Sequence, residues 1–446
     1  MNKITADFSQ GSVRRHVLSQ AVPLTLAQLV QLLYNVVDRI YIGHMPEIGD
    51  LALTGLGVAF PVIVIISAFA GLCSTGAVTL FSIARGRDDT EEAQKLLGTA
   101  FSLLTLGAAV MFTLFYVFRT PVLYLFGASE QSIIYAEPYL RIYLLGTLFS
   151  VLSTGLNGFI NAQGAPRIGM LTTVIGAVCN IALDPLFIFG LNMGVTGAAL
   201  ATIISQVISC LWVLGFLLRK RAAFGLKRGY FRLQAQRVRK VILLGIPWFV
   251  GQATNSLVAI ICNTQLQLHG GDLYVGIMTV VNSVREMTSL PVMGISNGAQ
   301  PVLGFNYGAG KPDRVKSGIR IVALLGSGCT LVTWLLVMLI PKQLIGIFTR
   351  DAATIEAGAR MLNIYFFGFV FMSFQLVGQS TFQSLGKAKF AVFFSLLRKA
   401  FIVVPLTVIL PWFFGVEGVF LAEPVSNVLG GLACIITMYF TVYRKL

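Results

Sequence analysis

Acidic and amide side chains recur at helical spacing inside strongly apolar stretches of this chain. A helix over residues 16–43 would carry on one face Gln28, Gln31, Asn35 and Asp38, with Tyr34 beside them. A helix over residues 168–190 would carry on one face Thr173, Asn180 and Asp184. Carboxylates are costly to insert into a bilayer, and those found there are by default functional. Asp38 and Asp184 are therefore the first candidates for chemistry.

These two acids are expected to lie close together. Counting from the ends of the apolar stretches places four residues in the outer third of the first half: Asp38, Asn180, Asp184 and Thr202. Neighbouring carboxylates repel each other, so one of them is expected to keep a proton near neutral pH. With Asn35 and Tyr34 beside it, this group is predicted to bind H⁺ or Na⁺. The alternative is that hydroxyl and amide groups cap each carboxylate and that both acids are purely structural.

The second half of the chain carries a different polar set. Glu286 falls near mid-membrane and would attract a cationic substrate, or else would pair with an arginine such as Arg141 or Arg360. Uncharged residues complete the predicted substrate surface: Gln31, Gln252, Asn255, Asn282, Met293, Gln300 and Gln375.

The composition is that of a membrane protein. Of the 446 residues, 56% are hydrophobic and 11% charged, with a mean hydropathy of +0.81. Soluble domains carry roughly 25% charged residues, and about 20 apolar residues cross a bilayer. We expect an all-α fold with twelve transmembrane helices. The predicted spans are about 16–43, 52–82, 94–118, 132–158, 168–190, 195–218, 241–267, 273–305, 317–340, 355–385, 390–412 and 417–442.

Several other classes of protein are excluded. The net charge of +15 does not indicate nucleic-acid binding, because the basic residues gather in alternate loops. The six cysteines lie in apolar stretches without paired spacing, so we expect neither disulfides nor a zinc site. The HExxH motif is absent and the loops are too short for a catalytic domain. We therefore expect no enzyme and no cofactor.

One motif occurs twice, about half a chain apart. Its two copies are Leu140-x-Ile142-Tyr143-x-x-Gly146 and Leu362-x-Ile364-Tyr365-x-x-Gly368. With six spans per half, both halves enter the membrane from the same side, which makes the repeat parallel. The predicted organisation is an N-terminal lobe over 1–218, a basic cytoplasmic linker over 219–240 and a C-terminal lobe over 241–446. The surface between the duplicated lobes is the expected place for a substrate.

The repeat keeps the scaffold but not the charges. Asp184-Pro185 aligns with Val404-Pro405, so the proline recurs and the acid does not. Thr202 falls opposite Glu423. The two halves are therefore expected to share one architecture and to differ in function, with the ion site in the first half.

Lysine and arginine positions predict the orientation. Of the 33, 26 are counted with the N-terminus, the connections after even-numbered spans and the C-terminus, among them Arg398 and Lys399. The opposite set of connections holds only Arg119, Lys342 and Arg350. By the positive-inside rule, both termini are expected in the cytoplasm.

Taken together, these residues resemble the multidrug and toxic compound extrusion (MATE) family, close to its MepA-like bacterial branch. The resemblance covers nearly the whole chain. Its motifs in the first half are Pro23 with Tyr34-Asn35-x-x-Asp38, Asn157-x-x-x-Asn161-Ala162-Gln163-Gly164, Asn180-x-x-x-Asp184-Pro185 and Gly194-x-x-Gly197-Ala198-Ala199-x-Ala201-Thr202. Those in the second half are Arg285-Glu286, Asn297-Gly298-Ala299-Gln300-Pro301 and Asn306-Tyr307-Gly308-Ala309.

The resemblance implies two six-helix lobes around a central cleft. It implies efflux of lipophilic, often cationic drugs or dyes in exchange for H⁺ or Na⁺, from the bacterial cytoplasmic membrane and by a monomer. In relatives with an ion site in the N-terminal lobe, the positions matching Asp38, Asn180, Asp184 and Thr202 form it. The NorM-like branch also carries acids in spans seven and ten. This chain has Gln252 and glutamines there, which puts a second sodium site of that type in doubt.

A different transport function stays open. A flippase for lipid-linked precursors, from the wider superfamily, would share the helices and the cleft. Such flippases tend to have a cationic cavity, whereas the polar stripes predicted here are acidic and amide. Transport of small dyes would distinguish the two functions.

Overall fold

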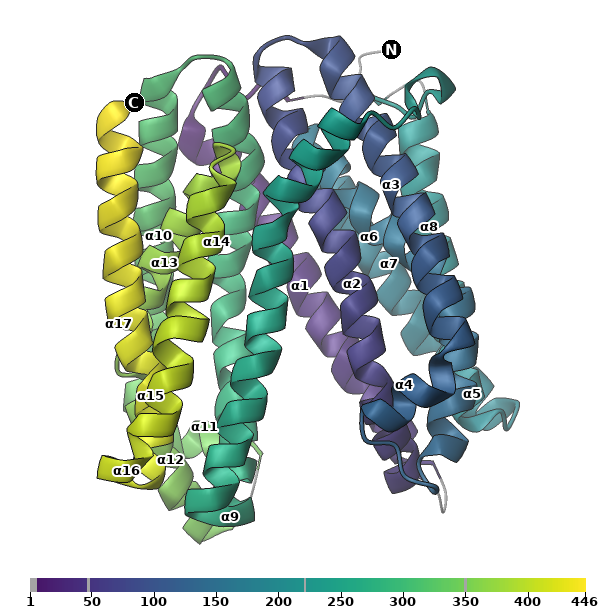
Figure 1. Ribbon diagram of the computed structural model, residues 1–446, viewed down its shortest axis with the longest axis vertical. Helices are drawn as coiled ribbons and strands as arrows, with labels where there is room; N and C mark the ends of the chain where they lie inside the picture. Colours follow the sequence, from purple (N-terminus) through teal and green to yellow (C-terminus); the bar gives the residue numbers. More distant parts are fainter. Residues whose placement is uncertain (1–5, 46–48, 220–221, 349–350) are drawn as a thin grey trace. The chain divides into compact units, whose positions relative to one another are not determined.

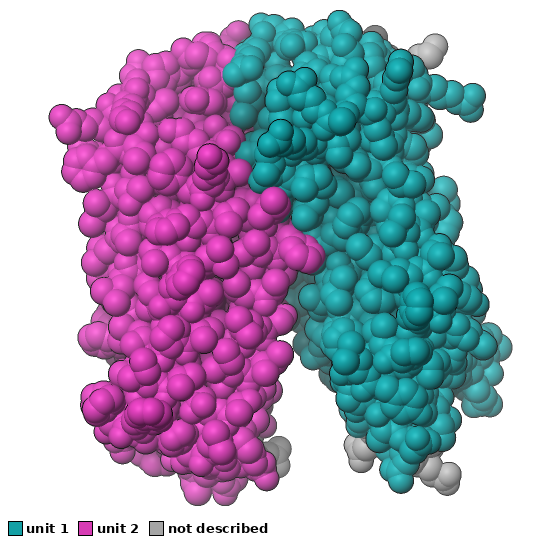
Figure 2. Space-filling view, in the orientation of Figure 1, with its two compact units in different colours: residues 1–7, 26–245 teal, residues 8–25, 246–446 magenta. Residues whose placement is uncertain are grey.

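The computed structural model describes residues 6–45, 49–219, 222–348 and 351–446, and over these residues it is helical, with no strand (Figure 1). Four basic residues that entered the charge pattern, Lys3, Lys220, Arg221 and Arg350, lie outside the described residues. The chain divides into two compact units (Figure 2). Unit 1 comprises Met1–Asp7 and Leu26–Gly245, and unit 2 comprises Phe8–Thr25 and Ile246–Leu446. The predicted lobe boundaries stay a prediction, to which the structure adds that residues 8–25 pack with unit 2.

The first half of the chain supplies six long apolar segments. They are α1 (Val13–Gly43), α2 (Gly49–Gly86), α3 (Thr90–Val117), the pair α5 (Ile133–Leu145) and α6 (Thr147–Ala162), α7 (Pro166–Pro185) with the π-helical turn η1 (Leu186–Gly190), and α8 (Gly194–Leu218). A short helix, α4 (Arg119–Leu125), connects α3 to α5. The Asp89 side chain caps the start of α3 by accepting a hydrogen bond from the Glu92 amide at 2.9 Å.

The second half follows the same plan. Its long segments are α9 (Ala235–Gly308), α10 (Pro312–Leu339), α12 (Ala352–Phe366) with η3 (Phe369–Phe371) and α13 (Met372–Ser384), α14 (Ala388–Leu396) continued by η4 (Leu397–Val403), α15 (Val404–Ile409) and α16 (Pro411–Phe414), and α17 (Val416–Thr441). Shorter helices are η2 (Arg228–Tyr230), α11 (Pro341–Gly346) and η5 (Tyr443–Lys445).

Within the described residues, nine helices are long and apolar enough to cross a membrane, or eleven if each of two bent pairs is one span. The 74-residue α9 is broken at Gly271, where φ is 66° and ψ is −167°, so it contains two spans in succession. Only glycine adopts this backbone conformation without strain. Counting α9 as two gives the predicted twelve.

Both bent pairs turn at the repeated glycines. α5 and α6 meet at 57° at Gly146, and α12 and the segment from Phe369 meet at 43° at Gly368. A β-carbon on Gly146 would lie 2.8 Å from Ile203 Cγ1 of α8, and one on Gly368 would collide with the Pro424 carbonyl of α17. Each bend therefore lets the following helix approach closely.

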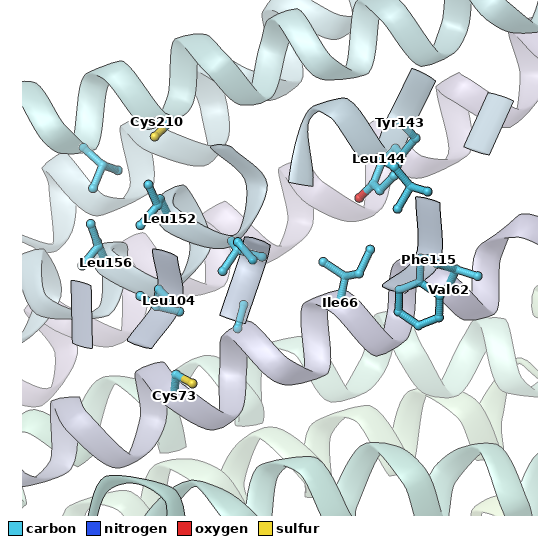
Figure 3. Close-up of a cluster of buried hydrophobic side chains, with 14 of the residues drawn as sticks. Val62, Ile66, Cys73, Leu104, Phe115, Tyr143, Leu144, Leu152, Leu156 and Cys210 are labelled. Carbon is cyan, nitrogen blue, oxygen red and sulfur yellow. The ribbon is translucent and has the colours of Figure 1, made fainter. Parts of the chain in front are cut away.

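Unit 1 has a continuous apolar core. α2 packs against α3, α5 and α6, and α8 packs against α5, α6 and α7. Leu104, Leu144 and Leu156 are fully buried in this core, and Cys73 and Cys210 are buried free thiols within it (Figure 3). Unit 2 has its own cluster, in which Phe366, Phe369 and Phe420 are buried where α12 and α13 pack on α17.

The predicted linker is folded against unit 1. Gln163 donates to the Phe224 carbonyl at 3.0 Å and accepts from the Phe224 amide at 2.9 Å. Ser102 donates to the Phe231 carbonyl at 2.7 Å. Arg237 donates two hydrogen bonds, of 3.0 and 2.8 Å, to the carboxylate of Glu92. The last residues of the linker already belong to α9, which begins at Ala235.

Candidate functional site

The acidic residues of α1 and α7 meet α8 inside unit 1. The Asn180 amide nitrogen donates to Asp184 Oδ1 at 3.2 Å and lies 3.3 Å from Thr202 Oγ1, to which it also donates. The Asp38 and Asp184 carboxyl groups interact directly with each other. The structure thus brings together the four residues that were expected to share a depth.

This site is closed from solvent and holds unused acceptors. Asp184 is 0% exposed, Asn180 1%, Thr202 5% and Asp38 8%. Asp38 Oδ1, Asp184 Oδ2 and Asn180 Oδ1 receive no hydrogen bond from a protein donor among the described residues. Three such oxygens in one buried group are unusual, because buried polar atoms are nearly always paired. The arrangement can hold a proton between the carboxyls or a small cation among the oxygens.

The local backbone explains how Asp184 reaches the site. Pro185 follows it directly and α7 then widens into the π-turn η1, which breaks the regular ladder. Gly197 lets α8 approach this turn, because a β-carbon there would lie 2.8 Å from the Phe187 carbonyl. Thr202 on α8 is held by a 2.9 Å hydrogen bond to the Ala198 carbonyl. The acid, amide and hydroxyl are therefore positioned by backbone packing.

The remaining predicted ion-site residues differ in placement. The Tyr34 side chain is close enough to Asp38 and Asp184 to interact with them electrostatically and so borders the site. Asn35 is exposed and accepts a hydrogen bond at 3.4 Å from Gln31, which is also exposed on α1. Asn35 and Gln31 therefore pair with each other rather than entering the buried group.

Two tyrosines and a glutamine border this site without having been predicted. Tyr139 and Tyr143 of α5 are 3% and 4% exposed and stack at 6.2 Å. Tyr139 is close enough to Asp38, Tyr34 and Asp184 to interact with them electrostatically. Gln206 of α8 donates to the Tyr143 hydroxyl at 3.5 Å. The available signal was the repeated motif itself, which contains Tyr143 and returns it as Tyr365.

Unit 2 contains a cavity of about 170 Å³. It lies among α9, α12, the segment from α14 to α15, and α17. Its polar lining consists of Asn255, Asn263, Asn282, Arg285, Tyr365, Lys399, Thr407 and Glu423, with Cys262 beside them. Its apolar lining consists of Val258, Ala259, Met278, Val403, Val419 and Ala422.

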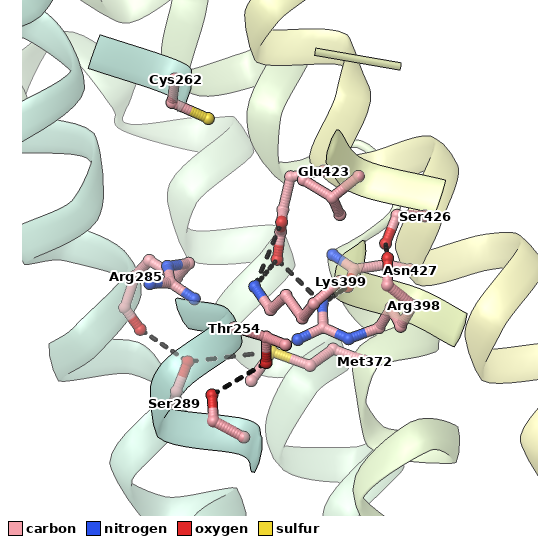
Figure 4. A network of polar contacts seen from close by, with 12 residues as sticks. Thr254, Cys262, Arg285, Ser289, Met372, Arg398, Lys399, Glu423, Ser426 and Asn427 are labelled. Carbon is pink, nitrogen blue, oxygen red and sulfur yellow. Dashed lines mark hydrogen bonds and ion pairs between the residues drawn. The ribbon is translucent and has the colours of Figure 1, made fainter. Parts of the chain in front are cut away.

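Lys399 and Glu423 of the cavity lining belong to a charge network (Figure 4). Glu423 Oε1 accepts from Arg398 Nη1 at 2.9 Å and from Lys399 Nζ at 3.3 Å, and Oε2 lies 3.5 Å from the same Nζ. Arg398 Nη1 also donates to Asn427 Oδ1 at 2.8 Å. Arg285 enters from α9, and its Nε has no hydrogen-bond partner among the described residues. One carboxylate therefore faces three cationic side chains.

The charge pattern includes Arg398 and Lys399 among the loop residues, although both fall within the predicted span 390–412. The structure places both in η4, inside the segment Ala388–Phe414, and Lys399 is only 6% exposed. Adjacent residues point about 100° apart on an α-helix, but the wide π-turn lets both reach Glu423. Gly430 leaves room for the Arg398 stem, because a β-carbon there would lie 3.0 Å from Arg398 Cγ.

The predicted substrate residues of the second half are dispersed. Asn255 and Asn282 line the cavity. Glu286 is exposed and not part of the lining, and Arg360 pairs instead with Glu417 at 2.5 Å. The other predicted residues lie away from the cavity. Gln252 and Met293 are half-buried on α9, Gln300 donates to Asn297 Oδ1 at 3.4 Å, and buried Gln375 donates to the Phe394 carbonyl at 3.1 Å.

Comparisons with known proteins agree with this architecture. The model of the MatE family matches residues 23–186 and again residues 247–409. The chain is 24% identical to the multidrug export protein MepA of Staphylococcus saprophyticus over 436 residues, which cover 97% of this chain and 95% of that protein. The MepA of Staphylococcus aureus strain N315 is 23% identical over 435 residues, with the same coverage of both chains.

Solved structures show the same fold. An outward-facing multidrug resistance MATE family transporter of the MOP superfamily is 22% identical, with a TM-score of 0.92 and coverage of 100% of both chains. A MOP superfamily transporter from Pyrococcus furiosus Vc1 is 21% identical, with a TM-score of 0.93 and the same coverage. The predicted all-α fold with two repeated six-helix halves is thereby confirmed.

Proposed function

Because the chain belongs to the MatE family, whose model matches both of its halves, we propose that it is a multidrug efflux antiporter. It exports lipophilic, mostly cationic compounds in exchange for H⁺, with Na⁺ as the alternative ion, by alternating access. It acts as a monomer in the bacterial cytoplasmic membrane with both termini in the cytoplasm. Its relatives named MepA, similar over nearly the whole chain, support the drug-export part of this proposal.

The buried carboxyl pair carries the ion-exchange part. Asp38 and Asp184 interact directly, and each has an oxygen that no protein donor satisfies among the described residues. Two adjacent buried carboxylates cannot both be charged without a large electrostatic cost, so one proton or one cation stabilises the pair. Gain of H⁺ from outside and its loss to the inside would then alternate the charge of the site during transport.

The same oxygens could also serve as ligands for Na⁺. A hard cation prefers oxygen ligands, and both carboxylates, Asn180 Oδ1 and Thr202 Oγ1 could supply them. The described residues contain no group of three or more His, Cys, Asp or Glu side chains that could hold a metal ion. A site with two carboxylates suits a proton or a monovalent ion.

The test is dye export from proteoliposomes under separate pH and sodium gradients. With ethidium as substrate, we expect the wild-type protein to respond to the pH gradient and the Asp184→Asn variant to lose at least tenfold of that rate. Asp272→Asn is the matched control, because Asp272 is exposed and lies far along the chain from the pair. Unchanged pH-driven export by Asp184→Asn would refute the assignment, and export driven by sodium alone would select Na⁺.

A lipid-linked precursor flippase is the second candidate, and one observation favours it. Arg285 and Lys399 line the cavity of unit 2 and Arg398 binds its one carboxylate, an excess of positive charge that an anionic lipid headgroup would require. The acidic pair in unit 1 and the MepA relatives favour drug export instead. Coupled export of ethidium would exclude flipping as the main activity, whereas its absence together with lipid flipping would establish it.

A further inference from the structure

The cavity in unit 2 has an unbalanced charge. Glu423 is shared by Arg398 and Lys399, and Arg285 brings a third positive charge to the same space. No second carboxylate lines the cavity among the described residues. Uncompensated charge in a space of low polarity is costly, so a negative group entering the cavity would be strongly favoured.

The repeat makes this cavity the counterpart of the acidic site. Tyr143 borders the acidic pair and its repeat partner Tyr365 lines the cavity. Thr202 belongs to the acidic site, and Glu423 occupies the corresponding place in the second half. The two halves thus build polar sites at equivalent positions, one with surplus acid and one with surplus base.

We infer that the cavity binds the carboxylate of a small amphipathic organic anion or zwitterion. The Arg285 guanidinium, with an unpartnered Nε, can donate through its planar fork to both oxygens of a carboxylate. Lys399 also lines the cavity and supplies its amino group as a second donor. This site extends the substrate range beyond cations and does not depend on which ion is exchanged in unit 1.

The rest of the lining suits the body of such a molecule. Val258, Met278 and Val419 give the cavity apolar walls, and Asn255 and Asn282 offer amide groups. One water needs roughly 10–15 Å³ of such space, so about 170 Å³ admits an organic group. Apolar walls with a few convergent polar groups are the usual make-up of small-molecule sites.

Two probes of equal shape test this inference. We would measure binding of 1-naphthaleneacetate and of its neutral analogue 1-naphthaleneacetamide to purified full-length protein by equilibrium dialysis. The wild-type protein is expected to bind the carboxylate at least tenfold more tightly. Equal affinity for the two probes would overturn the inference. So would displacement of the carboxylate by chloride or inorganic phosphate at equal concentration, because the site would then hold a simple inorganic ion.

Variants of cavity residues test whether the preference for the carboxylate probe arises in this cavity. Arg285→Gln is expected to bring the two affinities within about twofold, while Arg360→Gln, at an arginine that is exposed and pairs with Glu417, keeps the full preference. Lys399→Met should lower the preference and leaves Glu423 bound to Arg398. A preference that survives both cavity variants would refute the site. Because binding is measured without ion gradients, its result is separate from that of the Asp184→Asn transport test.

Discussion

Glu423 and its basic neighbours show how much one buried charge depends on its partners. Glu423 is 5% exposed and Lys399 6%, and Arg398 joins them from the same π-turn. A buried carboxylate is tolerable only when it is paired, and a buried cation likewise. Removing the single acid therefore has a different consequence from removing one of several bases.

This asymmetry predicts unequal stabilities. Glu423→Gln leaves the cations of the cavity without a counter-charge and is expected to destabilise the protein by about 3–5 kcal/mol, the usual cost of breaking a buried ion pair. Lys399→Met leaves the 2.9 Å pair of Glu423 with Arg398 and should cost clearly less. Thermal unfolding of the purified variants in detergent measures both. Equal losses, or a larger loss for Lys399→Met, would contradict this account of the network.

At the residue scale, the sequence predicted one site better than the other. Asp38, Asn180 and Asp184 follow regular helical spacing, so counting along the spans was enough to bring them to one depth. Lys399 could not be placed in this way, because its contact with Glu423 depends on a π-turn that a helical repeat of 3.6 residues does not reveal. Tyr139 was missed because it lies just outside the repeated motif, which begins at Leu140.

At the scale of elements, each half of the chain contains one bent helix pair. Gly146 and Gly368 occupy the same place in the repeat, and both lie at a bend where another helix comes close. The sequence identified the repeated glycines but gave no reason to expect a bend there, since neither is accompanied by a helix-breaking proline. The reason is packing, because α8 and α17 need the space of a missing side chain.

The bends predict a matched pair of effects. Gly146→Ala would press on Ile203 and on Gln206, whose side-chain oxygen would lie 2.9 Å from the new carbon. Gly368→Ala would press on the Pro424 backbone beside Glu423. Overpacking of this kind costs about 1–3 kcal/mol, and we expect a lowered melting temperature for each variant.

Gly276→Ala is the control for these bends, because no atom lies within 4 Å of its added carbon. It should melt no lower than the wild-type protein, because alanine is favoured over glycine inside a helix. A Gly146→Ala variant as stable as this control would show that the bend does not depend on close approach of α8.

At the scale of the whole molecule, the two halves repeat one architecture and differ in charge. The first half supplies paired acids and the second a cavity with surplus base. Regular hydrophobic spans and the parallel repeat were evident from the sequence, and the twelve spans follow from them. The packing of residues 8–25 with unit 2 was not evident, because most of them form the first turns of a helix that begins at Val13 and continues into unit 1 as an ordinary apolar span.

The division of charge leads to a prediction about driving force. If one H⁺ enters for each monovalent cation expelled, no net charge moves and the membrane potential has no effect. The pH gradient alone then drives export, at about 1.4 kcal/mol per pH unit. A zwitterion carries no net charge, so its exchange for one H⁺ moves one positive charge inward and gains about 2.3 kcal/mol per 100 mV.

Proteoliposomes with a potassium diffusion potential distinguish these cases. At a fixed pH gradient, ethidium accumulation is expected to be the same at 0 and 100 mV. Accumulation of a zwitterionic dye should rise, up to a limit of roughly 50-fold set by the same electrical energy. Ethidium accumulation that grows with the potential would instead require two ions per drug. The Asp184→Asn variant should show neither pH-driven accumulation of ethidium nor a potential-dependent rise of the zwitterionic dye, because its buried pair has lost the acid that exchanges the proton.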